Sequence, residues 1–479
     1  MIKSFFSIYR PSYFSTIIYM LQSSEYDIRK YLSWYWTTQD FSKVRIRGNL
    51  KKTSAAKMLL ISVVFIALLE VLIGIYCVYL WKNNQLFAGW TFGLALILGY
   101  PIIIANLIII PLFMARILLV SPSNNRKIIK SEKIFKDFKG EKIAIVGSYG
   151  KTSMKELLVS VLGDYKNIAF TPGNKNVAIS HANFAFNLKG DEDILLIEYG
   201  EGAPKDVELF ARITHPTRAI ITGLAPAHLD KYKTLKAAGE DIFSVSNFLS
   251  ENKVYVNQES GDTSSFLKPK FNLYNRSGIG SWKVSEIKNN LEGISFKMSN
   301  GKTTLKLASK LVGRHHIGAL VLVASLALEL GLSEDQVING ISNTKPYEHR
   351  MQPYQLNGAT IIDDTYNGNI EGIKAGTELL SELDAKKKFY VTPGLVDQGK
   401  ETKSVHEKMG ELIAKSDADT VVLMKNSVTH FIETGLKKGV YDKKVIIEKN
   451  PLKFYKNLDQ FVASGDVVLM QNDWPDQYK

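Results

Sequence analysis

Two long apolar runs interrupt the otherwise mixed pattern of hydrophobic and polar positions along the chain. Between Met58 and Leu80 the only charged residue is Glu70, and between Leu86 and Ala115 there is none. Each run is longer than the roughly 20 residues that a helix needs to cross the hydrocarbon core of a bilayer. The pattern therefore predicts a two-helix transmembrane hairpin over residues 58–120.

The second apolar run is longer than one straight span requires. At 1.5 Å per residue it would extend over about 45 Å, which exceeds the thickness of the hydrocarbon core. Proline removes a backbone donor and crowds the preceding turn of a helix. We therefore expect Pro101 or Pro111 to kink this helix or to mark its end.

Basic residues both precede and follow the hairpin, whereas the linker between its two apolar runs contains only one basic residue, Lys82. Because Lys and Arg are retained in cytoplasmic segments, both ends of the hairpin are predicted to be cytoplasmic. This predicts a multi-pass protein of the inner membrane with the remaining domains on the cytoplasmic face. The flanking residues are Lys43, Arg45, Arg47, Lys51, Lys52 and Lys57 before the hairpin, and Arg116, Arg126, Lys127 and Lys130 after it.

The segment before the hairpin, residues 1–57, is predicted to be cytoplasmic or interfacial. Apolar side chains at helical spacing predict an amphipathic helix within residues 12–40 that lies in the headgroup layer, with packing against another domain as the alternative. A carboxylate inside a span is costly unless it is protonated or paired, so Glu70 is assigned to helix pairing or to self-association as a homo-oligomer. The spaced residues are Ile28, Tyr31, Leu32 and Tyr35, with Trp34 and Trp36 beside them.

From Lys142 onward, strand-like runs alternate with helical ones, which predicts an α/β fold with parallel sheets covered on both faces. Short alternating runs between Phe271 and Val312 predict a small antiparallel insertion, and a strongly apolar helix follows from His315 to Leu330. A second α/β set comes after it. The predicted domains are 121–345 and 346–479. The predicted strands are KIAIV, DILLIEYG, RAIITG and KVYVN, then ATIID, KFYVT, DTVVLM, KVIIE and DVVLM, and the predicted helices include Asp206 to Ile213 and Thr234 to Leu249.

A glycine turn joins the first of these strands to a helix in KIAIVGSYGKTSMKELL, residues 142–158. Glycines leave backbone amides free to converge on phosphate oxygens, and the helix presents its positive end to them. The lysine of this turn supplies a point charge and its threonine can ligate magnesium. The strict GxxxxGK[ST] motif fails, because it would require glycine at Ile145. The turn nevertheless predicts use of ATP with Mg²⁺. Its candidate nucleotide-binding residues are Gly147, Ser148, Gly150, Lys151, Thr152 and Ser153.

Two further polar residues follow neighbouring strands. Glu198 ends the strand DILLIEYG, and His228 follows the next strand in ITGLAPAHLDKY. Ligands of open parallel sheets gather outside the carboxyl ends of the strands, where the glycine turn also lies. Glu198 is therefore a candidate magnesium ligand, and His228 could complete a metal or phosphate site. The alternative for each is a solvated polar residue at the end of a strand.

The order of these segments resembles the Mur ligase family over about residues 140–479. GSYGKTS is similar to the family's GSNGKTT, TPGNKN (171–176) to its glycine-asparagine segment, LIEYG to its second-metal glutamate, and APAHLDKY to its metal-site histidine. EHRMQPYQLNGATIIDDTYNGN (348–369) is similar to the family's arginine and IDDxYNANP segment, most of all in the branch that attaches D-alanyl-D-alanine. The resemblance implies a parallel-sheet ATP-binding central domain followed by a Rossmann-like C-terminal domain.

The resemblance implies an ATP-dependent, ADP-forming ligase of peptidoglycan and cell-wall synthesis. In such an enzyme a substrate carboxylate becomes an acyl phosphate, which an amine attacks to form an amide. Lys151 would hold the β- and γ-phosphates, and Thr152 and Glu198 one magnesium ion. His228 would bind a second. Arg350 and Asp364 would meet the nucleotide and the incoming amine as the C-terminal domain closes. The substrate residues implied by the same match are Asn174, Asn176, Tyr366, Asn367 and Asn369.

Several segments depart from the family pattern. The region where a carbamylated lysine is expected reads GED, and Glu240 is hypothesised to replace the carbamate, with Gly239 and Asp241 beside it. GRHHIGA (313–319) lacks the family's asparagines, which leaves adenine contacts to His315 or His316. The family's N-terminal UDP-binding domain is absent, with the hairpin in its place. The implied muramyl peptide could therefore be linked to UDP or to a lipid.

Two alternatives remain beside a ligase that adds D-alanyl-D-alanine to a muramyl tripeptide. One is a ligase similar to poly-γ-glutamate synthetase, and the other is a membrane-tethered nucleotide-binding scaffold that forms no bond. The formal net charge of +13 suits a protein beside anionic membrane lipid. No basic run is interleaved with aromatic residues, so we expect no nucleic-acid partner.

Overall fold

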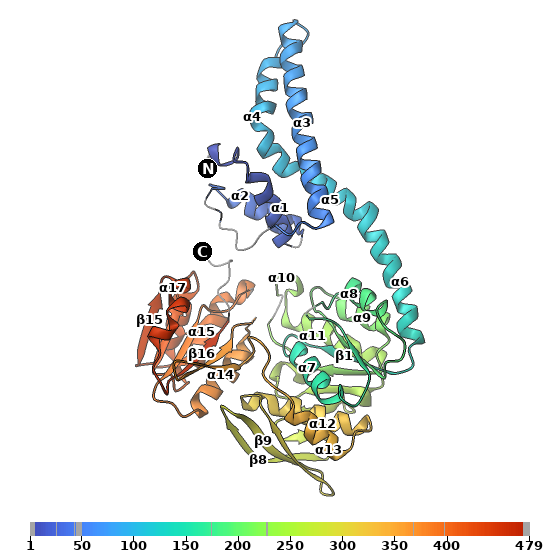
Figure 1. Cartoon of the computed structure of the whole chain (residues 1–479), viewed down its shortest axis with the longest axis vertical. Coiled ribbons are helices and arrows are strands. Elements are labelled where there is room, and N and C mark those ends of the chain that lie inside the picture. The colour runs from blue at the N-terminus through green and yellow to red at the C-terminus, as the bar shows by residue number, and fades with distance from the viewer. Residues whose placement is uncertain are drawn as a thin grey trace. The chain divides into compact units, whose positions relative to one another are not determined.

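The computed structural model describes residues 5–24, 26–42, 44, 50–173, 175–226, 229–366, 368–396 and 398–472. The chain divides into two compact units, Met1–Arg126 and Lys127–Lys479 (Figure 1). The boundary falls within helix α6 (Ser121–Asp137). Each unit is described by itself below.

The first unit contains the predicted pair of long apolar helices, α3 (Ser54–Lys82) and α4 (Gly89–Leu107), which form a hairpin (Figure 1). Their backbones approach closely through glycines. A Cβ atom on Gly93 would lie 2.5 Å from the carbonyl oxygen of Gly74, and one on Gly89 would collide with the carbonyl of Cys77. Small residues at such crossings are typical of helix pairs that pack in a membrane.

The second apolar run is broken as its length requires. Helix α4 ends at Leu107, and α5 (Ile109–Ala115) continues into the π turn η2 (Arg116–Val120). Pro101 lies inside α4. The break at Ile108 falls where Pro111 has no N–H to donate to the carbonyl of Leu107 and crowds that turn with its ring. Pro111 therefore marks the end of the straight helix.

The segment before the hairpin differs from its prediction. Instead of one amphipathic helix it forms the 3₁₀ turn η1 (Phe5–Ser7) and two helices, α1 (Tyr13–Ser23) and α2 (Ile28–Thr37). Tyr13 donates a hydrogen bond to the carbonyl of Pro101 (3.1 Å), and Tyr31 donates one to the carbonyl of Ala105 (2.8 Å). The aromatic face that was predicted to lie in the headgroup layer is thus packed against the hairpin.

The second unit begins with a ten-stranded sheet in the order β10-β9-β8-β7-β6-β5-β4-β1-β3-β2. Strands β1 to β6 are parallel, and β7 to β10 run antiparallel. The predicted antiparallel insertion is therefore an extension of the same sheet. The strands are β1 (Glu141–Val146), β2 (Ile168–Phe170), β3 (Ile194–Glu198), β4 (Arg218–Ile221), β5 (Val254–Asn257), β6 (Asn272–Asn275), β7 (Gly278–Ile279), β8 (Trp282–Asn290), β9 (Gly293–Ser299) and β10 (Thr304–Ser309).

Alternating side chains of β1 enter two separate cores, one on each face of this sheet. Ile143 and Ile145 pack with α7, α12 and α13, whereas Ala144 and Val146 pack with α9 and α11. A strand buried on both faces reads as a continuous apolar run, as KIAIV does. The predicted helix from Thr234 ends early, because α11 gives way to a 3₁₀ turn, η3 (Ser244–Phe248). The helices are α7 (Lys151–Leu162), α8 (Ala178–Ala185), α9 (Asp206–Thr214), α10 (Leu229–Tyr232), α11 (Leu235–Phe243), α12 (Ile317–Glu329) and α13 (Glu334–Ser342).

A six-stranded sheet follows, in the order β11-β12-β16-β13-β14-β15. All five predicted strands are confirmed, and β11 adds an unpredicted antiparallel edge. Helices cover both faces. The elements are β11 (Gln352–Leu356), β12 (Ala359–Asp364), α14 (Ile370–Glu382), β13 (Lys388–Thr392), α15 (Thr402–Ala414), β14 (Thr420–Met424), α16 (Thr429–Lys438), β15 (Lys444–Glu448), α17 (Pro451–Lys456), α18 (Leu458–Phe461) and β16 (Val467–Gln471).

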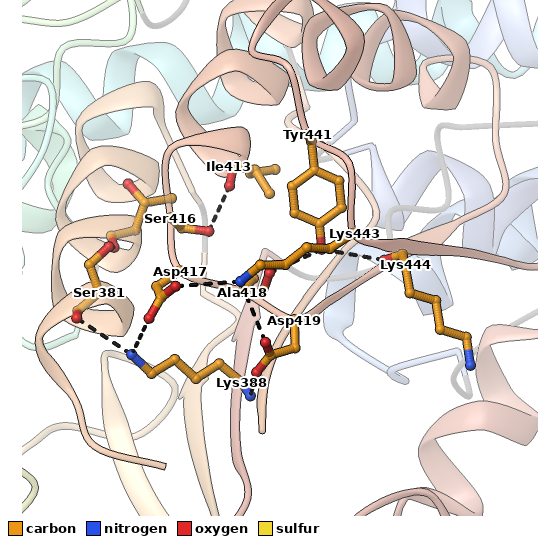
Figure 2. Close-up of polar contacts among 11 residues, drawn as sticks. Ser381, Lys388, Ile413, Ser416, Asp417, Ala418, Asp419, Tyr441, Lys443 and Lys444 are labelled. Atoms are coloured by element: carbon orange, nitrogen blue, oxygen red, sulfur yellow. Dashed lines mark hydrogen bonds and ion pairs between the residues drawn. The ribbon is translucent and has the colours of Figure 1, made fainter. Parts of the chain in front are cut away.

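A polar network ties together the amino ends of three of these strands (Figure 2). The ammonium group of Lys388 lies 3.0 Å from Asp417, and the backbone N–H of Lys388 donates to Asp419 (2.8 Å). Lys443 lies 3.4 Å from both carboxylates. The network fixes where β13, β14 and β15 begin. It leaves their carboxyl ends, at the opposite edge of the sheet, for binding.

Helices α15 and α16 cross closely through glycines, which generates a test of the fold. A Cβ atom on Gly435 would collide with the carbonyl oxygen of Glu407. We expect Gly435→Ala to lower the free energy of unfolding of the C-terminal domain by about 1–3 kcal/mol, because overpacking here displaces backbone. Hydrogen exchange of α15 and α16 during urea unfolding measures the loss. Gly261→Ala, at a site where a Cβ atom meets nothing within 4 Å, should leave exchange unchanged; equal protection in both variants would contradict the packing.

Candidate functional site

The glycine turn between β1 and α7 has the backbone that a phosphate site requires. Gly147 (φ 144°) and Gly150 (φ 74°) both occupy the positive-φ region that favours glycine. A Cβ atom on Gly147 would also collide with the side chain of Thr222. The N–H of Ser148 donates to the carbonyl of Gly223 (2.9 Å), which fixes the turn against the end of β4. Gly150 is the N-cap of α7, so the positive end of this helix opens beside the turn.

Lys151 begins α7 and lies over the turn. Its ammonium group donates to the carbonyl of Gly147 and forms an ion pair with Glu201, whose Oε2 lies 2.7 Å away. Both side chains are largely buried, with 11% and 6% exposed. Glu201 was not predicted as a site residue. It follows β3 by a short turn, so its approach to Lys151 depends on the pairing of β1 with β3.

The buried carboxylate of Glu198 is the centre of the site. Its Oε1 accepts from the Thr152 hydroxyl (3.1 Å) and from the Asn176 amide (3.4 Å), and its Oε2 forms an ion pair with Lys155 (3.0 Å). The fold thus brings together three residues predicted from separate segments, Thr152, Asn176 and Glu198. The hydroxyl and the carboxylate oxygens are hard donors, which fits a magnesium ion.

Lys155, like Glu201, is a site residue that sequence reasoning missed. It is fully buried, and its ammonium group donates to Glu198, to the carbonyl of Thr171 (3.0 Å) and to the carbonyl of Gly173 (2.6 Å). These contacts use all three hydrogens of the group. The available signal was a lysine one helical turn after Lys151, between Met154 and the apolar run that begins at Leu157.

The backbone of Glu198 is held as firmly as its side chain. Its N–H donates to the hydroxyl of Thr171 (3.0 Å), and its carbonyl lies 2.9 Å from Nε2 of His181. Burial lowers the pKa of His181 to about 4. The imidazole is therefore neutral at physiological pH, and its Nε2–H donates to the carbonyl of Glu198.

The structure turns Asp241, not Glu240, toward the interior beside the site. Tyr232 donates to the carboxylate of Asp241 (2.7 Å), and burial raises the pKa of Asp241. Glu240 lies on the exposed face of α11 with Lys236 as its ion-pair partner, 3.9 Å away. Its described contacts therefore do not support the hypothesis that Glu240 replaces a carbamylated lysine. Three other predicted residues, Asn174, His228 and Asn367, lie outside the described residues.

A cavity of about 890 Å³ opens beside the glycine turn, between the middle and C-terminal domains. The cavity therefore brings together residues that were predicted from distant parts of the sequence. The predicted residues that line it are Gly150, Ser153, His315, Arg350, Asp364, Tyr366 and Asn369.

Two adjacent imidazoles, His315 and His316, border this cavity with ring centroids 3.9 Å apart. Burial and the nearby charge of Arg276 lower the pKa of His315 to about 4. Burial also lowers the pKa of His316. Both rings are therefore neutral at physiological pH, and Nδ1 of His315 has no hydrogen-bond partner among the described residues. A neutral, partly unsatisfied pair suits a heterocyclic base better than a phosphate.

The C-terminal domain contributes a cation and an acid. The guanidinium of Arg350 lies over the ring of Tyr366, 4.4 Å from its centroid. Burial raises the pKa of Asp364 to about 6. Asn369 caps α14, because its side chain accepts from the N–H of Gly372 (2.9 Å). That cap is sufficient to explain Asn369 structurally.

Ion pairs hold α14 against the middle domain. Arg276 contacts Glu378 at 2.5 Å and Glu259 at 2.9 Å, and all three line the cavity. Arg314 contacts Glu382 at 2.8 Å. These contacts fix the distance across the cavity between the glycine turn and Asp364.

Comparison with known proteins finds matches to two family models within the second unit. The model described as Mur ligase middle domain matches residues 145–327, and the model described as Mur ligase, glutamate ligase domain, matches residues 349–471. A UDP-N-acetylmuramoyl-tripeptide–D-alanyl-D-alanine ligase of Escherichia coli is 26% identical over 325 residues, covering 64% of this chain and 70% of the relative. The enzyme of that name from Borreliella burgdorferi is 27% identical over 334 residues, covering 67% and 68%.

Solved structures share the fold. The MurF ligase of Thermotoga maritima, solved in complex with ADP, superposes with a TM-score of 0.64 at 22% identity over 74% of this chain and 82% of that one. MurF from Acinetobacter baumannii gives a TM-score of 0.64 at 18% identity, covering 73% and 77%. A pseudomurein peptide ligase type C from Methanothermus fervidus gives 0.54 at 16% identity, covering 71% and 78%.

The Lys155–Glu198 pair generates a test with two readouts. In Lys155→Met a buried carboxylate loses its partner, which costs about 3–5 kcal/mol of folding free energy where the charge persists. We expect a corresponding drop in stability and loss of magnesium-dependent ATP turnover. The double variant Lys155→Met/Glu198→Gln should regain stability but not turnover. Lys133→Met, exposed on α6, is the control. Wild-type turnover in Lys155→Met would contradict the assigned role.

Proposed function

The chain belongs to the Mur ligase family, and from that premise we propose that it joins D-alanyl-D-alanine to the carboxylate of a UDP-linked muramyl tripeptide. ATP, the family's phosphoryl donor, supplies the group that converts this carboxylate to an acyl phosphate. Attack by the amine then forms the amide and releases phosphate. The observation that supports the proposal is that Gly150 of the glycine turn, Arg350 and Asp364 line one cavity.

The phosphate end of the site is formed by the turn and by α7. Backbone N–H groups of residues 149–152 at the helix terminus would bind the β- and γ-phosphates together with Lys151. Lys151 would exchange its ion pair with Glu201 for phosphate oxygens. The Thr152 hydroxyl and Oε1 of Glu198, 3.1 Å apart, would hold Mg²⁺, because Oε2 is already taken by Lys155.

The base end of the nucleotide would lie against the neutral pair His315 and His316. The loop that carries Asn176, whose amide donates to Oε1 of Glu198 (3.4 Å), would receive the acceptor's carboxylate. The reacting carboxylate would then lie beside the magnesium ion.

The amine would enter from the C-terminal domain. Arg350 would neutralise charge on the transferred phosphoryl group, and Asp364 would attract the ammonium form of the dipeptide and accept its proton. The relatives named above act on a UDP-linked tripeptide, whereas none of them is a poly-γ-glutamate synthetase. The alternatives are a lipid-linked acceptor, glutamate polymerisation and a scaffold that forms no bond. Each would give a different result in the product assay described below.

We further propose that the first unit anchors the enzyme in the inner membrane with its catalytic domains in the cytoplasm. Helices α3 and α4 are long and apolar enough to span a bilayer. Many of their apolar side chains are exposed, Phe65, Leu68 and Leu72 among them, whereas the core helix of a soluble protein would bury them.

Aromatic residues mark the expected interface at the hairpin tip. Tyr76 and Tyr79 stack at 6.4 Å between centroids, and Trp81 and Trp90 lie 6.3 Å apart. Tyr and Trp are enriched where hydrocarbon meets headgroups. Lys51, Lys52 and Lys57 precede the opposite end of the hairpin, so the charge asymmetry agrees with cytoplasmic termini.

The ligase proposal predicts a product of defined mass. Full-length protein in detergent, given ATP, Mg²⁺, UDP-muramyl tripeptide and D-alanyl-D-alanine, should form UDP-muramyl pentapeptide with release of one phosphate per bond. Mass spectrometry and phosphate assay measure both. Lys151→Ala should abolish turnover and leave membrane insertion intact. Product only from a lipid-linked tripeptide would replace the UDP assignment, and a glutamate polymer would favour the second ligase. Nucleotide binding without phosphate release for any acceptor would favour the scaffold.

The anchor proposal predicts the side on which the hairpin tip lies. In a Cys77→Ser background, Asn84→Cys should react with a membrane-impermeant maleimide on intact spheroplasts. Lys189→Cys, exposed in the catalytic unit, should react only after permeabilisation. Mass shift on gels measures both. Labelling of Asn84→Cys that also requires permeabilisation would refute a spanning hairpin.

A further inference from the structure

The last strand of the chain ends in a buried amide that contacts the candidate amine-binding acid. Nε2 of Gln471 donates to Oδ2 of Asp364 (2.7 Å) and to the carbonyl of Gly372 (2.9 Å). Gln471 is 1% exposed. No role in the proposed reaction has yet been given to it.

The orientation of this amide is determined by a third residue. The hydroxyl of Tyr390, itself fully buried, donates to Oε1 of Gln471 (2.6 Å). Nε2 faces two acceptors and Oε1 faces a hydroxyl, so a flipped amide would place like groups together. Every hydrogen-bonding atom of the amide is therefore satisfied in one orientation only.

Two features of the fold accommodate the contact between Gln471 and Asp364. Strand β16 lies between β12 and β13, which puts Gln471 between Asp364 and Tyr390 at the carboxyl end of the sheet. Gly376 of α14 packs over the amide, because a Cβ atom there would collide with its Oε1 and would lie 2.6 Å from its carbonyl carbon and from Nε2. A residue that served only to fill the core would not need this arrangement.

We propose that Gln471 is a positioning residue for Asp364. The Gln471 amide, oriented by Tyr390, holds the Asp364 carboxylate toward the cavity in the ionised form that receives the amine. The inference rests on the proposed function, since it assigns Asp364 to that amine. The N–H of Met351 donates to the other carboxylate oxygen (3.2 Å). The amide and this N–H thus leave the acid one fixed orientation.

The electrostatic surroundings of Asp364 give the sign of the effect. Burial raises its pKa to about 6, while the hydrogen bond from Gln471, the bond from Met351 and the charge of Arg350 lower it; Asp363 raises it. Asp363 is itself paired with His349, and burial together with the charge of Asp364 raises the pKa of Tyr390. Removing the amide therefore favours the protonated acid, so less carboxylate is present at a given pH.

The test is the pH dependence of kcat/KM for D-alanyl-D-alanine, measured on the full-length protein. In the wild type the acid limb should lie near pH 6. Gln471→Met keeps the volume but removes the donor, and should move this limb upward by about one unit. The loss should be about ten-fold at acid pH and should disappear at alkaline pH. Tyr390→Phe should give a smaller shift in the same direction.

Two further variants separate positioning from general damage. Gln471→Glu places a second carboxylate beside Asp364 and should move the acid limb further than Gln471→Met, because the two acids compete for one proton. Gln355→Met makes the same substitution in β11, where the amide contacts only Thr360 among its described hydrogen-bond partners, and should leave the profile unchanged. An unshifted limb in Gln471→Met, or a loss that is constant at every pH, would overturn the inference.

A readout that needs no turnover keeps the two proposals distinct. Carbon NMR of protein with labelled aspartate carboxyls, with Asp364→Asn to assign the signal, reports the titration of Asp364 directly. If the wild type forms no pentapeptide while Gln471→Met raises the titration midpoint, the proposed function fails and the positioning role remains. If the wild type is active and the midpoint is unchanged, the function remains and the role of Gln471 is wrong.

Discussion

The buried ion pair between Lys155 and Glu198 is the interaction on which the catalytic unit depends. Both side chains are out of solvent, and an unpaired charge at such a place would be strongly destabilising. The pair joins α7 to the end of β3, and Lys155 also holds the carbonyls of Thr171 and Gly173. The glycine turn, the carboxylate proposed to bind magnesium and the loop proposed to receive the acceptor are therefore parts of one cooperative structure.

Parallel strands explain why the candidate site residues of the two sheets lie at the same end of their strands. In both sheets the predicted ligand-binding residues lie at the carboxyl ends of strands, Glu198 as the last residue of β3 and Asp364 as the last residue of β12, where open α/β sheets bind their ligands. The amino ends carry structural networks instead, as Lys388, Asp417 and Lys443 do (Figure 2). Ion pairs of Arg276 and Arg314 with α14 then set the distance between the two sheets.

Local sequence patterns predicted the helices and strands. The site residues that were missed depend instead on contacts between segments distant in sequence. The glycine spacing around Lys151 and the apolar run of β1 are local signals, and the turn and strand were predicted from them. Lys155, Glu201 and Gln471 acquire their roles only through strands distant in sequence, so no local pattern identifies them. Glu240 and Asp241 differ by about 100° of helical phase. Only the packing of α11 shows that Asp241 is the buried one. The same holds for α2, because its buried Tyr31 and Tyr35 belong to the predicted aromatic face, whereas contact of that face with the hairpin was not predicted.

The balance of charge in the site gives a reason why magnesium is needed. The cations Lys151 and Lys155 are matched by the anions Glu201 and Glu198, so the phosphate end has no surplus positive charge from these groups. A triphosphate that displaced Glu201 from Lys151 would leave a further carboxylate beside its own charge. Mg²⁺ compensates for both, and the hydroxyl of Thr152 with Oε1 of Glu198 is where the protein can hold it. Nucleotide and metal are therefore expected to enter together, because either alone would leave the site with uncompensated charge.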